Sequence, residues 1–337
     1  MPILNPWVND AFSMASLTDA INIIPNNYGK IGAMNLMPIK GVATRAIEVE
    51  EKNGILNLIT SKPLGSPGAQ NKTGKRVSRL FKVPHLPLDD TLLPAEYDGI
   101  RAFGTENELT PYVSIMNDKL TSMKNKHAIT LEHLRMGALK GVILDGDGDV
   151  LYNLYTEFGI DQKTVAFALG NSATKVRTKC LAVSRHIEKN LMGETKNGVH
   201  VLCSEGFFDA LIEHPNVKAA YENHGEASDR LGGDPREGFK FGGLVFEEYN
   251  ASAPDAEGNT RKFIADNEAH AYPTGTMDTF STYVAPADFV ETANTIGLPF
   301  YAKQEPRKFN RGIDLHTQSN PLPLCKRPGI LVKLTVA

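Results

Sequence analysis

The residues most suggestive of chemistry are the three aspartates in the run DGDGD. Asp145, Asp147 and Asp149 have the alternate spacing of the first ligands in an EF-hand calcium loop. The rest of that motif is missing, because the sixth position is Val150 where glycine is required and the twelfth is Thr156 in place of glutamate. Strand-forming residues flank the run, so we interpret it as the tight Asp-Gly turn of a β-hairpin.

Other candidate catalytic or metal-binding groups do not combine into a site. His127 and His133 are six positions apart on one expected helix, so they face different sides, and neither has a Cys or carboxylate at ligand spacing. Ser204 follows Cys203 at an expected strand-to-helix junction, but the glycines of a nucleophile elbow are absent, and we expect Ser204 to cap the helix. No Walker or dinucleotide-binding fingerprint occurs. We therefore expect no catalytic residue, no metal site and no cofactor.

Composition restricts the possible classes of protein. The 337 residues include 36 Lys and Arg against 39 Asp and Glu, which argues against a surface built throughout for nucleic acid. The three cysteines, Cys180, Cys203 and Cys325, are far apart and odd in number, so we expect reduced thiols. No apolar run reaches the roughly 18 residues that a membrane span needs, and the N-terminus does not resemble a signal peptide. We expect a soluble cytosolic product with no membrane partner.

The element around which the chain is organised is a long helix expected at 110–141. Thr110 is predicted to cap it, and Pro111 suits the first helical position. At 1.5 Å per residue, such a helix is roughly 45 Å long, about the width of a whole domain. A stripe with helical spacing defines its buried face: Val113, Met116, Leu120, Met123, His127, Leu131, Leu134 and Ala138.

Two segments before this helix are not expected to form cores of their own. Residues 1–41 carry scattered apolar residues broken by prolines and predict one short helix at 16–22, so this arm must lie on another surface. In residues 42–83, β-rich stretches stand on either side of Asn53-Gly54, which predicts a hairpin turn there. A further strand, KRVSRLFKV, follows a tip rich in Gly, Pro and Ser. We expect this second arm to project.

The projecting arm is basic, and this has two interpretations. No Asp or Glu occurs between Asn53 and Leu88. The arm is either a nucleic-acid finger or a contact with acidic or polar groups of a neighbouring subunit. Phe81 is its only aromatic residue, so the stacking platform of a single-strand binder is missing, and we favour the protein contact. The candidate inter-subunit contacts are Lys62, Lys72, Lys75, Arg76, Arg79 and Lys82.

The second half of the chain predicts short, mixed elements. Strands at 142–144 and 150–155 should pair as a hairpin, and a second helix, capped by Ser172 and closed by Gly193, should pack along the first. From about residue 196, short strands and helices alternate, ending in the strand GILVKLTV. This pattern predicts an α+β fold class.

The order of these segments resembles the major capsid protein E family of tailed bacteriophages, the lambda-type coat proteins with the HK97-like fold. The resemblance covers nearly the whole chain. It rests on these sequences: FKVPHLPLDD, EYDGIRAFG, HLRMGALKGVILDGDG, VLYNLYTEFG, YVAPADF, FYAKQEPR and SNPLPLCKRPGILVKL. The resemblance implies an HK97-like division of the chain into an N-terminal arm at 1–41, an extended E-loop hairpin at 42–83, a peripheral domain at 84–195 with its spine helix at 110–141, an axial domain at 196–318, and a C-terminal strand at 319–337 that returns to the core.

The same resemblance implies a structural protein without catalytic activity. It should self-assemble into hexamers and pentamers of an icosahedral shell that encloses double-stranded DNA, in the host cytoplasm and then in the virion. The implied partners are further copies of itself, scaffold, portal and decoration proteins, and packaged DNA held non-specifically on the inner face. Flexible hinges are expected at Pro38–Gly41 and Pro84–Pro87. The alternative is a nucleic-acid-binding module that uses the basic arm 62–82, which predicts a small oligomer with salt-dependent DNA affinity.

Overall fold

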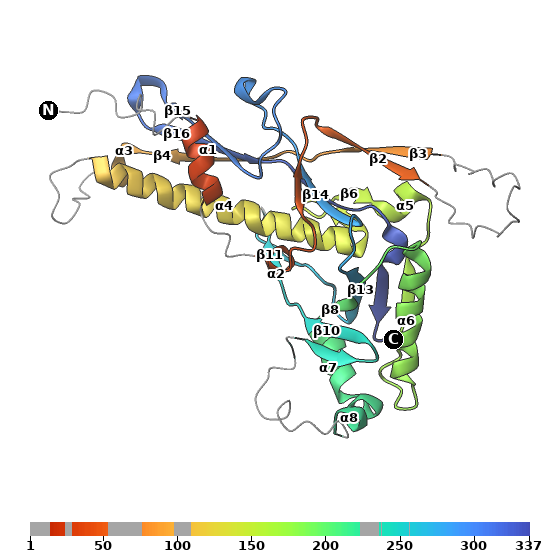
Figure 1. The fold of residues 1–337 in the computed structure, drawn as a ribbon. Coiled ribbons are helices and arrows are strands. Elements are labelled where there is room, and N and C mark those ends of the chain that lie inside the picture. The colour runs from red at the N-terminus through yellow and green to blue at the C-terminus, as the bar shows by residue number, and fades with distance from the viewer. Residues whose placement is uncertain are drawn as a thin grey trace, which may run out of the picture.

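The computed structural model describes residues 14–23, 29–52, 76–97, 109–222, 236, 238–255 and 257–337. Figure 1 shows two parts, an elongated platform built on one long helix and a smaller part that extends from one end of it. Helices and strands are mixed throughout, so the predicted α+β fold class is confirmed.

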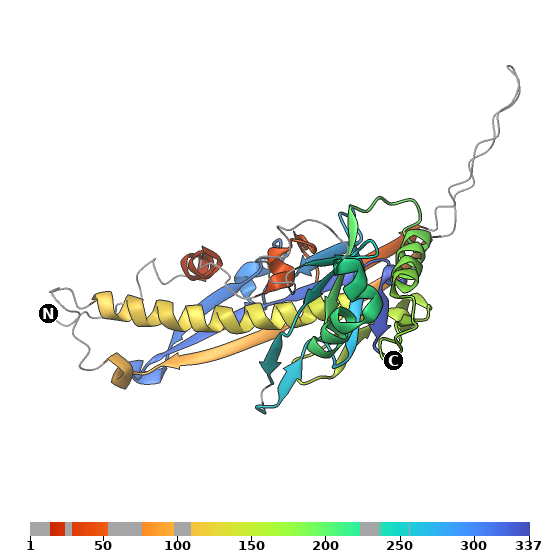
Figure 2. The same ribbon diagram turned by 90° about the horizontal axis from the view of Figure 1, so that it is seen from below.

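The long helix α4 (Leu109–Lys140) runs along the whole platform (Figure 2). It begins one residue before Thr110, so the prediction that Thr110 caps it is wrong. Pro111 still lies in the first turn, where backbone N–H groups have no partner within the helix and proline is tolerated. The predicted stripe is confirmed from residue 116 onward, because all of these residues are buried: Met116, Leu120, Met123, His127, Leu131, Leu134 and Ala138.

The aspartate-rich run forms a turn, as predicted. β5 (Val142–Leu144) pairs antiparallel with β6 (Val150–Asn153). The N–H of Asp145 donates to the carbonyl of Asp149 at 2.8 Å and closes the hairpin between them. The carboxylates therefore belong to a β-turn and not to a calcium-binding loop.

The strand after this turn is shorter than predicted. The Asn153 side chain accepts hydrogen bonds from the N–H groups of Tyr155 and Thr156, and this cap starts helix α5 (Leu154–Phe158). The helix ends at Gly159, which has a φ of 63°. The expected strand at 150–155 thus ends where a side chain satisfies the first free N–H groups of a helix.

A three-stranded antiparallel sheet lies along α4. Its order is β15 (Tyr301–Pro306), β16 (Ile313–Ser319) and β4 (Leu86–Leu92), so the sheet joins strands that are more than 200 residues apart in sequence. Between α4 and the sheet lies a core that includes Leu92, Met116, Leu120, Ala302 and Leu315.

The N-terminal segment packs on the platform. α1 (Met14–Ile23) confirms the short helix expected at 16–22, and it buries Leu17 and Ile21 against α4 and β15. α2 (Lys30–Ala33) also lies on α4, with Ile31 buried. The sequence predicted that this segment packs on another surface. For α1 and α2, that surface is formed by other elements of the same chain.

One predicted hinge is wrong. β1 (Ile39–Gly41) pairs in parallel with β14 (Phe280–Val284), which in turn pairs with β17 (Pro321–Cys325). The residues expected to form a flexible hinge at Pro38–Gly41 are therefore held by the backbone hydrogen bonds of a sheet. At the second predicted hinge, Pro87 lies within β4.

The projecting arm is a β-hairpin at its base. β2 (Ala46–Lys52) pairs with β3 (Arg76–Lys82) over its whole length, from Ala46 opposite Lys82 to Lys52 opposite Arg76. This pairing corrects the prediction that the partner of β2 follows directly after an Asn-Gly turn. Asn53 and Gly54 themselves lie outside the described residues.

The smaller part contains a six-stranded mixed sheet. Its order is β7 (Lys163–Ala166), β18 (Val332–Thr335), β13 (Glu268–Thr274), β8 (Gly198–Cys203), β10 (Leu244–Glu248) and β9 (Phe239–Phe241). β18, the last strand of the chain, lies between β7 and β13 within this sheet.

Helix α6 (Val176–Asn190) differs from its prediction in two ways. It begins after Lys175, and no side chain caps it, so Ser172 is not its cap. Its buried residues contact β13 and the turn η6 (Pro328–Ile330) instead of packing along α4. Figure 1 shows α6 running across the direction of α4, because its apolar face covers the six-stranded sheet.

The remaining elements are short. They are α3 (Pro94–Tyr97), α7 (Glu205–Glu213), α8 (Pro215–Glu222), β11 (Ser252–Pro254), β12 (Thr260–Lys262), η4 (Val290–Thr292) and η5 (Lys308–Asn310). Ser204 occupies the N-cap position of α7, but its hydroxyl makes no capping hydrogen bond. Within the described part of the chain, no helix could span a membrane, and no group of three or more His, Cys, Asp or Glu could hold a metal ion.

Candidate functional site

The base of the β2–β3 hairpin is fixed to the platform by aromatic residues. Phe81 is fully buried and contacts the rings of Tyr152, at 5.3 Å between centroids, and Phe158, at 6.3 Å. The Tyr152 hydroxyl accepts a hydrogen bond from the N–H of Lys82 at 2.8 Å and donates to its carbonyl at 2.9 Å. The hairpin therefore leaves the body from a fixed point and at a fixed angle.

The predicted contact residues are only partly within the described chain. Arg79 donates from Nε to the carbonyl of Glu157 at 2.8 Å, and its guanidinium lies 4.4 Å from the centroid of the Phe158 ring. Lys82 is exposed at the base. The structure thus brings Arg79 and Lys82 to the same end of the hairpin and gives Arg79 an internal role that the sequence did not suggest. The other candidates lie outside the described side chains: Lys62, Lys72, Lys75 and Arg76.

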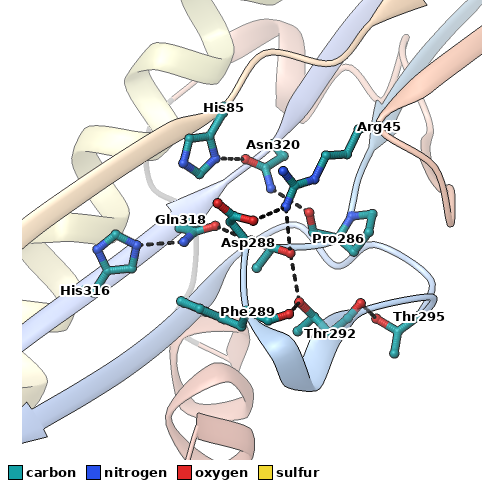
Figure 3. A network of polar contacts seen from close by, with 11 residues as sticks. Arg45, His85, Pro286, Asp288, Phe289, Thr292, Thr295, His316, Gln318 and Asn320 are labelled. Atoms are coloured by element: carbon teal, nitrogen blue, oxygen red, sulfur yellow. Dashed lines mark hydrogen bonds and ion pairs between the residues drawn. The ribbon is translucent and has the colours of Figure 1, made fainter.

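A polar network at the start of the hairpin joins it to a distant loop (Figure 3). Arg45, just before β2, donates to the Asp288 carboxylate at 2.6 Å and to the carbonyl of Ala287 at 3.3 Å. These hydrogen bonds from Arg45 hold the pKa of Asp288 below its usual value. The N–H of Asp288 also donates to Gln318 at 2.9 Å, which ties the loop to the end of β16.

The same network reaches the start of β4. The Asn320 amide donates to the carbonyl of Pro286 at 2.9 Å, and its oxygen lies 2.9 Å from His85 Nδ1. Gln318 Nε2 lies 2.7 Å from His316 Nε2 (Figure 3). Residues from four segments therefore meet where the hairpin joins the platform. The sequence did not predict this network, because its partners are more than 200 residues apart.

Two buried charges on α4 anchor the N-terminal segment. Lys124 is 3% exposed, and its ammonium donates to the carbonyls of Ile21 at 2.6 Å and Asn22 at 3.3 Å. It also lies 5.1 Å from the centroid of the Phe300 ring. These carbonyls end α1, where a cation is favoured. Burial lowers the pKa of Lys124, and the two carbonyls accept the hydrogen bonds of its ammonium group.

The second anchor has the opposite sign. Glu132 is 2% exposed, and its carboxylate accepts hydrogen bonds from the N–H groups of Ile31 at 2.6 Å and Gly32 at 3.2 Å, at the start of α2. It also accepts from the Tyr249 hydroxyl at 3.0 Å and lies 3.9 Å from the Arg135 guanidinium. Burial beside Glu132 raises the pKa of Tyr249, so this hydroxyl stays a donor.

Sequence reasoning missed both anchors. Lys124 and Glu132 are eight positions apart and follow directly after Met123 and Leu131 of the apolar stripe. Charged residues beside a stripe normally mark the solvated edge of a helix, and only the packing of α1 and α2 shows otherwise.

Comparison with known proteins identifies the family. A family model described as phage major capsid protein E matches residues 13–336. The chain belongs to the phage major capsid protein E family. It is a major capsid protein of a tailed phage and a component of the virion, and its family is one of structural proteins.

Relatives of this capsid protein agree with the assignment. The major capsid protein of Salmonella phage Felix O1 is 28% identical over 350 residues, covering 95% of each chain. That of Pseudomonas phage KPP10 is 28% identical over 344 residues, covering 97% of this chain and 98% of the relative. Neither relative supports the alternative of a nucleic-acid-binding module that uses residues 62–82.

Solved structures show that the predicted HK97-like capsid fold is correct. The putative capsid protein of a prophage of E. coli CFT073 has a TM-score of 0.61 at 14% identity, covering 96% of this chain and 99% of the other. A subunit of the mature capsid of bacteriophage PhiM1 has a TM-score of 0.52 at 12% identity, covering 92% and 88%.

This capsid protein exposes apolar side chains on the loop that the polar network holds. Val290, Ile296 and Leu298 are 92%, 69% and 43% exposed. The loop is nevertheless well fixed, because the Thr292 hydroxyl donates to the carbonyl of Ala287 at 2.8 Å and the N–H of Leu298 donates to Tyr301 at 2.8 Å. Apolar residues held in water by a fixed loop are typical of surfaces that are covered on assembly.

Proposed function

We propose that this chain forms hexamers and pentamers of an icosahedral head that encloses double-stranded DNA, with the β2–β3 hairpin reaching over a neighbouring subunit. The observation that carries this proposal is the hairpin itself, whose base is fixed by Phe81 and Arg45 while its strands leave the body (Figure 1). A fixed arm that leaves its own core gains burial only against another subunit.

The six basic residues of the arm remain our proposed inter-subunit contacts. They are Lys62, Lys72, Lys75, Arg76, Arg79 and Lys82. Their partners are acidic groups of the neighbouring copy. For Arg79, the proposal adds an external contact to its internal one with Glu157 and Phe158.

We propose the division into N-terminal arm, E-loop, peripheral domain, axial domain and C-terminal strand with two refinements. β15 and β16, within 301–319, pair with β4 beside α4, which supports placing them in the peripheral domain. β7 and α6, within 163–190, pack with the six-stranded sheet, which supports placing them in the axial domain.

The remaining proposals concern partners and location. Scaffold and portal proteins would act during assembly in the host cytoplasm, decoration proteins would bind the shell, and packaged DNA would contact the inner face without sequence preference. We propose no catalytic role for any residue.

Electron microscopy of the purified product tests this function. The chain, expressed alone and with the other head proteins of its phage, is expected to give rings, tubes or closed shells in negative stain. A compact monomer under all of these conditions contradicts the proposal.

A further inference from the structure

Three basic residues gather around a groove at the start of helix α6. Lys175 and Arg177, at its start, are exposed, and so is Lys240 on β9. Among the residues that the structure describes, none of these three cations forms an ion pair, although many other surface cations do. The three cations line one groove between α6, α8 and β9, with a volume of about 830 Å³.

The groove also has apolar walls. Phe239 and Phe241 line it with their rings parallel, 6.3 Å apart and inclined by 8°, and Leu181 and Ala220 complete it. Among the described strands, β9 is the last on this side of the six-stranded sheet, so its outer edge has no described neighbour within the sheet. Apolar walls with a basic rim are typical of a site for an acidic, partly apolar protein surface.

The same chain presents such a surface on α7. Glu205, Asp209 and Glu213 recur at intervals of four and form an exposed stripe on the helix face opposite its buried residues, Phe207, Phe208 and Leu211. Within the described chain, Asp209 and Glu213 form no ion pair, whereas Glu205 lies near Lys262 and contributes to raising its pKa. The groove is lined by α6, α8 and β9, and none of the residues of α7 lines it.

We propose that the acidic stripe of α7 (Glu205, Asp209 and Glu213) docks into the basic groove beside α6 (Lys175, Arg177 and Lys240) of the next copy of this chain. The occupant is a second copy because the groove and the stripe have opposite charge and no stripe residue lines the groove of its own subunit. A contact between two different surfaces repeats from copy to copy and closes a ring when the rotation allows it. The inference rests on the proposed assembly into capsomers and names the contact that forms them.

Charge reversal tests the contact on either side. One variant combines Arg177→Glu with Lys240→Glu, and the other combines Asp209→Lys with Glu213→Lys. Each alone places like charges together, so we expect the assembled fraction, measured by sedimentation velocity with the other head proteins co-expressed, to fall on the order of tenfold or more. The matched control, Arg185→Glu with Lys189→Glu, reverses exposed charges on α6 outside the groove and should assemble normally.

Mixing the two variants gives a sharper result. An acidic groove accepts a basic stripe, so a mixture can form rings in which the two chains alternate. The two variants can alternate throughout a ring of six. In a ring of five, two copies of the same variant must be neighbours, and like charges then meet. We therefore expect hexamers or tubes from the mixture without closed shells, whereas one chain that carries all four substitutions should again form shells.

A covalent test covers the case in which a variant fails to fold, as judged by circular dichroism. Leu181→Cys combined with Asp209→Cys should give an interchain disulfide ladder in wild-type-like particles, because Cys180, Cys203 and Cys325 are buried and do not interfere. Neither single cysteine variant should give a ladder. Normal assembly of both charge-reversed variants, or no ladder in intact particles, overturns the inference but leaves the capsid function in place. Shells of normal yield that lose only DNA binding would assign the groove to DNA, which also overturns it.

Discussion

Glu132 and Ile31 are 101 positions apart in sequence, yet the Glu132 carboxylate accepts the Ile31 N–H at 2.6 Å. With Lys124, which donates to the Ile21 carbonyl, Glu132 makes α4 the support of both N-terminal helices. Each anchor has the sign that the adjacent helix end favours, a cation at the end of α1 and an anion at the start of α2.

Replacing the Glu132 carboxylate should destabilise the subunit strongly. Glu132→Ala leaves the Ile31 N–H, the Tyr249 hydroxyl and the Arg135 guanidinium without their shared acceptor, and we expect a loss of about 3 kcal/mol in urea unfolding. Glu132→Gln keeps one acceptor oxygen and should lose less. The control Glu188→Ala removes the exposed carboxylate of a surface ion pair with Lys196 and should change stability by less than about 0.5 kcal/mol. Equal effects of Glu132→Ala and the control would contradict the anchoring role.

Replacing Gly29 with alanine should also destabilise the subunit. This residue has a φ of 113°, and a Cβ atom there would lie 2.6 Å from a carboxylate oxygen of Glu132. We expect Gly29→Ala to lower the melting temperature, with a cost of about 1–3 kcal/mol. At Gly146 a Cβ atom meets nothing within 4 Å, so Gly146→Ala is the matched control and should be nearly neutral. A melting temperature of Gly29→Ala that matches wild type would show that α2 can move away from α4 without cost.

The buried histidine of α4 should make stability depend on pH. Burial and nearby His316 lower the pKa of His127 to about 4, from the ordinary 6.5, and its Nε2 lies 2.9 Å from the Thr317 hydroxyl. The unfolded chain therefore binds the imidazole proton of His127 more tightly than the folded chain does. The contribution of neutral His127 to the free energy of unfolding is fully present above pH 6.5 and is lost as the pH falls towards 4. The total loss is about 3 kcal/mol. His127→Gln should flatten this part of the curve of unfolding free energy against pH. A curve that keeps the same slope between pH 4 and 6.5 after His127→Gln would contradict this role of His127.

The basic arm should act on assembly more than on folding. Reversal of Lys62, Lys72 and Lys75 to Glu should leave thermal unfolding of the monomer unchanged and lower shell yield in negative-stain micrographs by about tenfold or more, since like charges then face each other. Arg79→Glu should affect both measurements, because Arg79 also contacts Glu157 and Phe158 within the subunit. An unchanged shell yield after the triple reversal would count against the arm as a subunit contact.

Local patterns predicted the elements of this fold well. The stripe of α4 and the turn at Asp145–Asp149 depend on periodicity and turn chemistry within a few residues, and both were correct. Caps were predicted less well. Thr110 and Ser172 are good capping residues, but the helices begin one residue before the first and four residues after the second. A capping residue contributes only about 1 kcal/mol, so its presence alone does not fix where a helix begins.

The sequence by itself determined the α+β class, the long helix, the basic arm and the resemblance to phage capsid proteins, because these depend on composition, periodicity and the order of segments along the chain. Only the tertiary structure decided that Lys124 and Glu132 are buried anchors, that β4 pairs with β16, and that Arg45 reaches Asp288. Each of these contacts joins residues 100 or more positions apart. Whether a charged side chain is solvated or buried against such a partner depends on the packing of the whole chain and not on its neighbours in sequence.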